Sequence, residues 1–563
     1  MNVWARDAAQ VRASVNQWNR DRESFLYFPF PGSCARILWS RPNHRRPWTA
    51  APKDTCVRKL NCLFMAIAVS LLAAAPFAAA QTASLTILHT NDTHGHMLPF
   101  SYPDSAASGR ELQGLRVYKD IGGIARRATL IKHIRQELDK RAVPTWLVDI
   151  GDYSDGTPFS IEYHGEADVA AMNAVGYDMG TLGNHEFNNT AAQVRKLIAM
   201  TKYELVCANV TDRTTSKPMV LPYVIRKVGG VRVGVFGLMT KEAATYPAGK
   251  ETFDVTDEIP AARQTVATLR TQVDIIVLLS HAGEDMDQRI AVEVPEIDVI
   301  VGGHSHSRIP SGELVWHSQE LKAASVNGTV IVQAHQWAGE LGRLDLLFAK
   351  DETGAWHVDR YRAQLIPVSP DIPEDPGIAA VVGQFWKPIA LRYGDVIGQA
   401  AGEFSSRGDD MAEYHLMSDA LRESFNADFA VENLGGIRAP LLRGAITRGD
   451  LVTLDPFNNT VITFKATGKE IRQILQRYSP AVSGIRYRLQ NKELVEVTIG
   501  GQPLDDSRTY NGVTNSYFAG YALKGLAVQD TGKPRLETLI TYIREKGTIR
   551  PAYDGRRIVI SER

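Results

Sequence analysis

Four short runs of apolar and β-branched residues each lead to a side chain of a type that binds metal ions. The runs begin at Leu85, Trp146, Val273 and Ile297, and Gly or polar residues follow each of them. Runs of this length with such boundaries are typical of buried strands in an α/β sheet. Because such sheets place ligand sites at the carboxyl ends of their strands, we expect these polar side chains to converge on one edge.

Seven side chains that follow these runs, or lie in a loop between them, are candidate metal ligands. They are Asp92, His94, Asp152, Asn184, His281, His304 and His306. A single His is more often a core residue than a metal ligand, and a single Gly-Asp is more often a turn. The prediction therefore depends on the recurrence of metal-type side chains at successive strand ends. Asp, Asn and His ligands without Cys suit Zn²⁺, Mn²⁺ or Fe, and not a structural zinc bound by thiolates.

The number of candidate ligands indicates two ions. Seven ligands overfill one tetrahedral or octahedral centre that must also leave room for solvent. Two ions that share a carboxylate, ~3.5–4 Å apart, account for all of them, and Asp152 is the predicted bridge. Such a pair lowers the pKa of bound water toward neutrality and stabilises the entering and leaving oxygens of an in-line attack on phosphorus. The predicted reaction is therefore phosphoester hydrolysis.

These motifs resemble the calcineurin-like metallophosphatase pattern, and residues 84–560 resemble the two-domain 5′-nucleotidase family. The segments that carry the resemblance are Asp92-Thr-His94, Gly151-Asp152, Gly183-Asn184-His185-Glu186, His281 and Gly303-His304-Ser305-His306. The resemblance implies an α/β fold, in which a metallophosphatase β-sandwich flanked by helices (αββα) precedes a second α/β domain that binds the substrate.

The resemblance also implies how the ligands are divided between the two ions. One ion would be held by Asp92, His94, Asp152 and His306. The other would be held by Asp152, Asn184, His281 and His304.

His185 matches the family's histidine that stabilises charge on the phosphoryl oxygens or the leaving group. Most 5′-nucleotidases orient this histidine with an Asp three residues later, where this chain has Asn188. An Asn carbonyl can accept the ring N–H but adds no charge that favours the imidazolium, so we expect a less basic His185. Asn188 is also similar to the pattern of the periplasmic 2′,3′-cyclic-nucleotide phosphodiesterase and 3′-nucleotidase branch. A purely local role for Asn188, as a cap or turn residue, stays open.

The second half of the chain is predicted to form a separate domain. A proline-rich stretch, Pro367–Pro376, marks a boundary, and an apolar-striped helix is expected between Gly377 and Tyr393. We therefore predict a catalytic domain over residues 81–366, a linker and helix over 367–394, and a substrate-binding domain over 395–563.

The second domain contains a segment that resembles the family's substrate loop. It carries Asn433, Gly435, Gly436 and Arg438 in the order Asn-Leu-Gly-Gly-Ile-Arg. Glycines allow the backbone to approach a ligand closely, Asn offers a donor and an acceptor, and Arg presents a fork to an anion. We predict that these residues bind substrate.

Aromatic residues further along resemble the family's nucleobase clamp. Phe457 and Tyr517 match the two stacking positions, which contribute ~1–3 kcal/mol per base without selecting the base. Arg407 aligns with a further substrate-binding Arg. The family usually has a ribose-binding Asp where this chain has Leu523, so ribose recognition is lost, provided elsewhere or not needed. The alternative for the aromatic pair is an ordinary place in the core.

Composition and the first 80 residues bear on partners and location. The formal net charge is zero, with 63 basic and 63 acidic residues, which argues against binding of polymeric nucleic acid or an anionic membrane. Residues 57–80 have the basic start, apolar centre and Ala-rich end of a secretory signal peptide, and small residues interrupt them too often for a stable membrane anchor. Residues 1–56 are interpreted as a non-native or mis-annotated extension, with Val57 as initiator.

We expect a secreted dinuclear-metal hydrolase that releases phosphate from nucleotides, periplasmic if the source has two membranes. A 2′,3′-cyclic-nucleotide 2′-phosphodiesterase with 3′-nucleotidase activity is the main alternative, favoured by Asn188. A thiosulfate-pathway hydrolase shares the two-domain plan and stays open. An inactive binding protein is less favoured, because every expected ligand is present. The sequence alone does not predict the oligomeric state.

Overall fold

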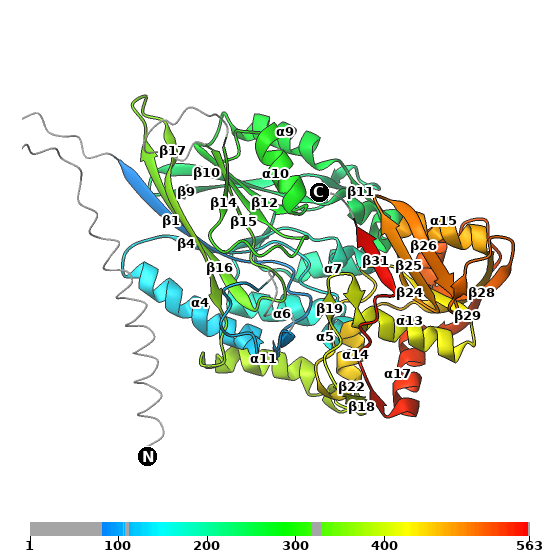
Figure 1. Ribbon diagram of the computed structural model, residues 1–563. Coiled ribbons are helices and arrows are strands. Elements are labelled where there is room, and N and C mark those ends of the chain that lie inside the picture. The colour runs from blue at the N-terminus through cyan, green and yellow to red at the C-terminus, as the bar shows by residue number, and fades with distance from the viewer. Residues whose placement is uncertain (1–80, 105, 107–111, 317–327, 561–563) are drawn as a thin grey trace, which may run out of the picture. The chain divides into compact units, whose positions relative to one another are not determined.

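The computed structural model describes residues 81–104, 106, 112–316 and 328–560 (Figure 1). The predicted extension and signal peptide, residues 1–80, lie outside the described residues. Among the helices of the described ranges, none has both the length and the hydropathy that a membrane span needs. Cys207 is buried and carries a free thiol.

Two six-stranded sheets form the first part of the chain, with the orders β17-β16-β1-β4-β5-β6 and β14-β15-β13-β12-β10-β9. The strands of the first sheet are β1 (Thr82–Thr90), β4 (Thr145–Asp149), β5 (Met179–Gly180), β6 (Glu204–Leu205), β16 (Glu340–Lys350) and β17 (Trp356–Pro367). The strands of the second sheet are β9 (Tyr223–Val228), β10 (Val231–Met239), β12 (Ile275–His281), β13 (Val299–Gly302), β14 (Glu313–Trp316) and β15 (Gly328–Val332).

The alternation of side chains along the strands places the core between the sheets and a helical layer outside each (Figure 1). Ile87 of β1 and Val277 of β12 lie in one buried cluster that joins the two sheets. Leu88 faces the other way, toward helices α4 (Ile124–Asp139), α6 (Glu166–Val175) and α7 (Ala191–Met200). Leu278 likewise faces α9 (Glu258–Leu269) and α10 (Glu284–Glu293). The predicted αββα sandwich is confirmed.

The metal-type side chains lie at the carboxyl ends of these strands, as expected. Strand β1 ends two residues before Asp92, β4 ends three before Asp152, β12 ends at His281, and β13 ends two before His304. Because β1 and β4 are parallel, as are β12 and β13, each pair delivers its ligands to the same side of its sheet.

The helix expected after the proline-rich stretch is present as α11 (Pro376–Trp386), followed by α12 (Ala390–Tyr393). Asp375 caps α11 by accepting a hydrogen bond from the backbone N–H of Gly377 at 2.9 Å. Ile378 and Val382 of α11 are buried in the same cluster as α4 and α6. The linker helix is thus anchored on the first sheet's helical layer.

The second part of the chain is built on a five-stranded and a four-stranded sheet, with the orders β24-β21-β28-β23-β29 and β27-β26-β25-β31. The five strands are β21 (Phe429–Glu432), β23 (Thr460–Thr467), β24 (Ala481–Ser483), β28 (Thr509–Asn515) and β29 (Val528–Pro534). The four are β25 (Ile485–Gln490), β26 (Glu493–Ile499), β27 (Gln502–Pro503) and β31 (Arg557–Ile560). Helices α13 (Ala412–Ser424), α15 (Gly468–Tyr478) and α17 (Arg535–Lys546) pack on these sheets through two further cores, which confirms a second α/β fold.

Candidate metal centre and substrate site

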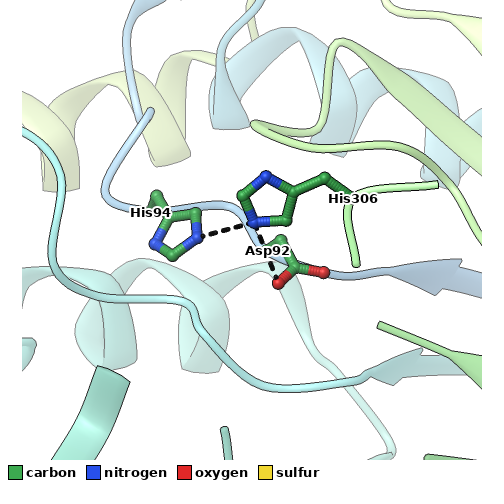
Figure 2. A group of neighbouring side chains, drawn as sticks. All are labelled: Asp92, His94 and His306. Atoms are coloured by element: carbon green, nitrogen blue, oxygen red, sulfur yellow. Dashed lines mark hydrogen bonds and ion pairs between the residues drawn. The ribbon is translucent and has the colours of Figure 1, made fainter. Parts of the chain in front are cut away.

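The first group of predicted ligands comprises Asp92, His94 and His306, whose ligand atoms lie within 4.8 Å of one another (Figure 2). Nε2 of His306 lies 3.2 Å from Nε2 of His94 and 3.4 Å from Oδ1 of Asp92. Nδ1 of His94 faces the backbone oxygens of Asp155 at 2.9 Å and Ser154 at 3.2 Å. Because only a protonated nitrogen can bond to a carbonyl, Nδ1 carries the ring proton, and Nε2 of the neutral ring presents a lone pair to the group.

The second group comprises Asp152, His281 and His304, with ligand atoms within the same 4.8 Å limit. Nε2 of His281 lies 3.1 Å from Oδ2 of Asp152 and 3.1 Å from Oδ1 of Asn184. Nδ1 of His281 lies 2.6 Å from the backbone oxygen of Ile150. As in His94, Nδ1 bonds to the backbone and Nε2 faces the other ligands of the group. All seven predicted ligands therefore fall into two adjoining groups.

The donor set fits divalent cations. Oδ2 of Asp152 lies 4.0 Å from Nε2 of His94 in the first group and 3.1 Å from Nε2 of His281 in the second. The Asp152 side chain is only 2% exposed. Buried carboxylates and ring lone pairs that face one another are unfavourable unless protons or cations lie between them. Asp152 therefore lies between the two groups.

Five of the seven predicted ligands have a left-handed backbone conformation. The φ angle is 49° at Asp92, 46° at His94, 52° at Asp152, 72° at His304 and 55° at His306. Residues other than glycine rarely adopt this conformation, which costs on the order of 1–3 kcal/mol each when strained. The concentration of such residues at one place is typical of a functional site.

Electrostatics keep Asp152 ionised and act in opposite directions on His304 and His281. Burial raises the pKa of Asp152, but His281 and His185 outweigh it and hold that pKa well below its usual range. Burial lowers the pKa of His304 to about 4. Burial also disfavours the charged form of His281, yet the Asp152 carboxylate raises its pKa to about 10. A bound cation would displace that proton.

The orientation of His185 differs from the expectation. His185 and Asn188 are the first and last residues of the short helix η1 (His185–Asn188). Nδ1 of His185 lies 2.8 Å from Oδ2 of Asp155, and Asn188 donates through Nδ2 to the same oxygen. Burial lowers the pKa of His185, but the carboxylates of Asp152 and Asp155 raise it above its usual value. The expected orientation of His185 by an Asn188 carbonyl is therefore wrong, and His185 is not less basic, because the carboxylates of Asp152 and, from another loop, of Asp155 supply the charge.

Glu186 anchors the loop that carries Asn184 and His185. Its carboxylate accepts hydrogen bonds from the backbone N–H groups of Gly183 at 2.8 Å and Asp152 at 3.1 Å. A Cβ at Gly183 would lie 2.2 Å from Oδ1 of Asp152, so only glycine fits there. The sequence motif contains Glu186, but this role could not be predicted from local spacing.

Two side chains that the sequence analysis missed lie at the rim of the second group. The amide of Asn184 donates to Oη of Tyr246 at 3.1 Å, which turns its carbonyl oxygen toward His281. Tyr246 donates to Oε1 of Glu242 at 3.2 Å, and Oε2 of Glu242 lies 3.8 Å from Nε2 of His304. Tyr246 thus fixes the amide orientation that a metal-binding Asn184 needs.

The predicted substrate loop reaches the metal ligands through Arg438. Nη2 of Arg438 lies 3.3 Å from Nε2 of His94. Gly435 has a φ of 85° and donates its backbone N–H to Oη of Tyr414 at 2.8 Å. Oδ1 of Asn433 accepts a hydrogen bond from Asn515 at 2.9 Å, so this side chain is bonded within the protein.

A fully buried arginine ties the substrate loop to a neighbouring loop. Arg535, the first residue of α17, donates to Glu432 at 2.6 Å, to Asp455 at 2.9 Å and to the backbone oxygen of Gly436 at 2.9 Å. The amide of Asn515 donates to the same Glu432 oxygen at 2.8 Å. This network was not predicted from the sequence, because its members are separated by up to 103 positions.

Of the two predicted stacking residues, Phe457 lies on the loop after Leu454 and Tyr517 lies in the first turn of helix α16 (Ser516–Ala522). Oδ1 of Asn459 accepts hydrogen bonds from Oγ of Ser516 at 3.0 Å and from the backbone N–H of Tyr517 at 3.2 Å. Tyr517 is 61% exposed. Phe457 lines a cavity of about 260 Å³ together with Asp155 and other residues. In the described part of the chain, no ring contact joins Phe457 to Tyr517.

Two other positions that the family resemblance singled out, Arg407 and Leu523, make their contacts within the second domain. The guanidinium of Arg407 lies over the ring of Tyr553, 3.9 Å from its centre. Leu523 is buried in the core with Phe518 and Leu475. The Leu523 side chain is therefore part of a hydrophobic core of the second domain.

Comparisons with known proteins agree with this arrangement. Residues 85–308 match the calcineurin-like phosphoesterase model and residues 396–524 match the model of the 5′-nucleotidase C-terminal domain. Protein UshA of Yersinia enterocolitica is 29% identical over 547 residues, which cover 86% of this chain and 93% of UshA.

A longer relative and a solved structure extend the comparison. The trifunctional nucleotide phosphoesterase protein YfkN of Bacillus subtilis is 27% identical over 548 residues, or 84% of this chain and 34% of YfkN. The crystal structure of a 5′-nucleotidase precursor from Thermus thermophilus superposes with a TM-score of 0.73 at 27% identity and covers 85% of this chain and all of that one. The chain is a metal-dependent phosphoesterase and belongs to the 5′-nucleotidase family, with a calcineurin-like phosphoesterase domain followed by a 5′-nucleotidase C-terminal domain.

Proposed function

We propose that the protein hydrolyses nucleotides to nucleoside and phosphate at a site for two divalent metal ions, Zn, Mn or Fe. The observation that carries the proposal is the pair of ligand groups on either side of Asp152, with the guanidinium of Arg438 3.3 Å from His94. Arg438 would supply a planar set of donors for a phosphate beside the metal ligands.

The residues that would hold the ions are those of the two groups. They are Asp92, His94, Asp152 and His306 for one ion, and Asp152, Asn184, His281 and His304 for the other. When bound, the ions would supply Lewis acidity, which polarises the phosphoryl group and lowers the pKa of water.

His185 and Arg438 would act directly on the substrate. Nε2 of His185 lies 4.0 Å from Oδ2 of Asp152, so this edge of the ring faces the metal groups while Nδ1 bonds to Asp155. A proton held at Nε2 can be donated to the leaving oxygen or can stabilise charge on it. Arg438 would fix the phosphate oxygens through hydrogen bonds from its guanidinium.

Nucleotides are the proposed substrate class because aromatic residues accompany the phosphate site. Phe457 lines the cavity that also contains Asp155 and Asn188. The exposed ring of Tyr517 would contact the other face of a base, and Asn459, on the loop that carries Phe457, accepts a hydrogen bond from the backbone of Tyr517. Stacking tolerates any base, so we expect a broad base preference.

The proposal is tested by phosphate release from residues 81–563 loaded with Mn²⁺ or Zn²⁺. The substrates are 5′-AMP, 3′-AMP, 2′,3′-cyclic AMP, UDP-glucose and p-nitrophenyl phosphate. We expect 5′-AMP to give the highest kcat/KM. Absence of phosphate release from every substrate would contradict the proposed function.

A second candidate is hydrolysis of 2′,3′-cyclic nucleotides and 3′-nucleotides. The presence of Asn188 beside His185 favours it, as does the similarity to YfkN, which is named a trifunctional nucleotide phosphoesterase. Faster turnover of 2′,3′-cyclic AMP or 3′-AMP than of 5′-AMP in the same panel would select this candidate.

Secretion is part of the proposal and is supported by the pattern of residues 57–80. We expect mass spectrometry of the protein from its native source to give a chain that begins at Gln81. A mature chain that begins before residue 57 would contradict both the signal peptide and the interpretation of residues 1–56.

A further inference from the structure

The geometry points to Asp155 as the residue that positions His185 for catalysis, an inference that rests on the proposed role of His185 in phosphoester hydrolysis. Oδ2 of Asp155 lies 2.8 Å from Nδ1 of His185. The Asp155 side chain is 16% exposed and that of His185 is 8% exposed, so solvent competes little for this contact.

The carboxylate of Asp155, which can only accept hydrogen bonds, determines where the proton of this contact lies. Nδ2 of Asn188 donates to Oδ2 of Asp155 and lies 2.8 Å from Nδ1 of His185. If the amide were flipped, its oxygen would face a carboxylate oxygen, which is repulsive. With the amide as placed, Asn188 donates to Oδ2 of Asp155, and Nδ1 of His185 carries a proton that it donates to the same oxygen. Nε2 is left to face the substrate side.

Asp155 is itself held rigidly. Its backbone N–H donates to Oγ of Ser160 at 2.7 Å, and its backbone oxygen accepts from Nδ1 of His94 at 2.9 Å. Its φ angle is 72°, in the left-handed region that residues other than glycine seldom adopt. One residue thus orients a predicted metal ligand through its backbone and His185 through its side chain.

The placement of Asn188 provides a test by exchange of the two side chains. Asp155→Asn keeps the shape and both backbone hydrogen bonds but removes the charged acceptor. Asn188→Asp in that background returns a carboxylate to within hydrogen-bond distance of the same ring nitrogen. The control is Asp254→Asn, which removes an exposed carboxylate that pairs with Arg213.

We expect Asp155→Asn to lower kcat for the best substrate by about 10²-fold, with KM and metal content little changed. The double variant should recover to within about tenfold of the wild-type kcat, and the control should match the wild type. An Asp155→Asn protein with wild-type kcat would overturn the inference. So would a folded, metal-loaded double variant that is as slow as the single variant.

Proton NMR of the Zn²⁺-loaded wild-type protein gives a readout that does not depend on turnover or on the folding of Asp155→Asn. We expect a far-downfield Nδ1–H resonance, assigned to His185 by its loss in His185→Gln, because the hydrogen bond is charge-assisted. Absence of that resonance from the wild type would refute the contact. If the wild type hydrolyses no ester, the proposed function fails, while the NMR experiment still tests the placement of Asp155.

Discussion

At the scale of single residues, the site depends on histidines whose ring protons are fixed by backbone carbonyls. Ile150 accepts from His281, and Asp155 accepts from His94. These bonds hold the Nε2 atoms toward the carboxylates, which is the orientation that imidazole ligands of a metal need. Each ring is thereby oriented before any ion is bound.

Asp152→Ala should abolish phosphate release and reduce metal content. The change removes the carboxylate between the two ligand groups and also the acceptor for the backbone N–H of His185 at 2.8 Å. We expect kcat/KM to fall by more than about 10³-fold, because loss of an ion removes several kcal/mol of transition-state stabilisation. Elemental analysis and phosphate release measure the two effects. Asp254→Ala serves as the control, and unchanged turnover in Asp152→Ala would contradict the proposed site.

A buried histidine away from the ligand set should make the protein sensitive to acid. His89 in β1 is 1% exposed, and burial lowers its pKa to about 3. Because the unfolded chain binds this proton near pH 6.5 and the folded chain does not, stability is lost as the pH falls from about 6.5 to about 3. The loss is up to about 5 kcal/mol.

Thermal unfolding at a series of pH values checks this prediction. His89→Asn, which stays neutral throughout, should lose less stability between pH 7 and pH 4 than the wild type does. Parallel pH profiles for the two proteins would show that His89 does not contribute.

At the scale of elements, helix α17 holds the substrate loops in register through Arg535. This side chain bonds to Glu432 at the end of β21 and to Asp455 just after α14 (Arg448–Leu454). It also bonds to the backbone of Gly436 in the substrate loop. The loops that carry Arg438 and Phe457 are therefore joined by one guanidinium.

Arg535→Met should destabilise the protein by about 3–5 kcal/mol, because it leaves two buried carboxylates without their partner. Arg544→Met on the same helix is the matched control. Arg544 is half exposed and pairs with exposed Asp395, so its loss should cost at most about 1 kcal/mol. Chemical denaturation compares the two variants, and equal stabilities would show that the buried network contributes nothing specific.

Phe457→Ala should raise KM for nucleotides by about 10- to 100-fold, the effect of losing one stacking contact. Hydrolysis of p-nitrophenyl phosphate, which has no nucleobase, should change much less. Steady-state kinetics on both substrates measure the difference. An equal loss on the two substrates would indicate that Phe457 supports the loop and does not bind the base.

At the scale of the whole molecule, the features that were predicted correctly from the sequence are those that short local patterns encode. The β-branched runs ending near Asp92 and His281 predicted the strands and the convergence of the ligands, because strand ends in such sheets have a fixed relation to the site. The orientation of His185 was not predictable, since Asp155 lies 30 positions away in another loop. The buried contacts of Arg535 were not predictable for the same reason, since Asp455 lies 80 positions away in the sequence. Contacts between distant loops have no periodicity from which they can be inferred.

The burial of Cys207 makes residues 81–563 suitable for single-site labelling. Burial raises the pKa of this thiol to about 12, so it is almost entirely protonated at neutral pH and unreactive toward thiol reagents. We expect no reaction of the folded protein with a colorimetric disulfide reagent until denaturant is added; rapid reaction under native conditions would contradict this. A cysteine introduced at an exposed position, such as Leu391 on α12, would then be the one site that takes a fluorophore.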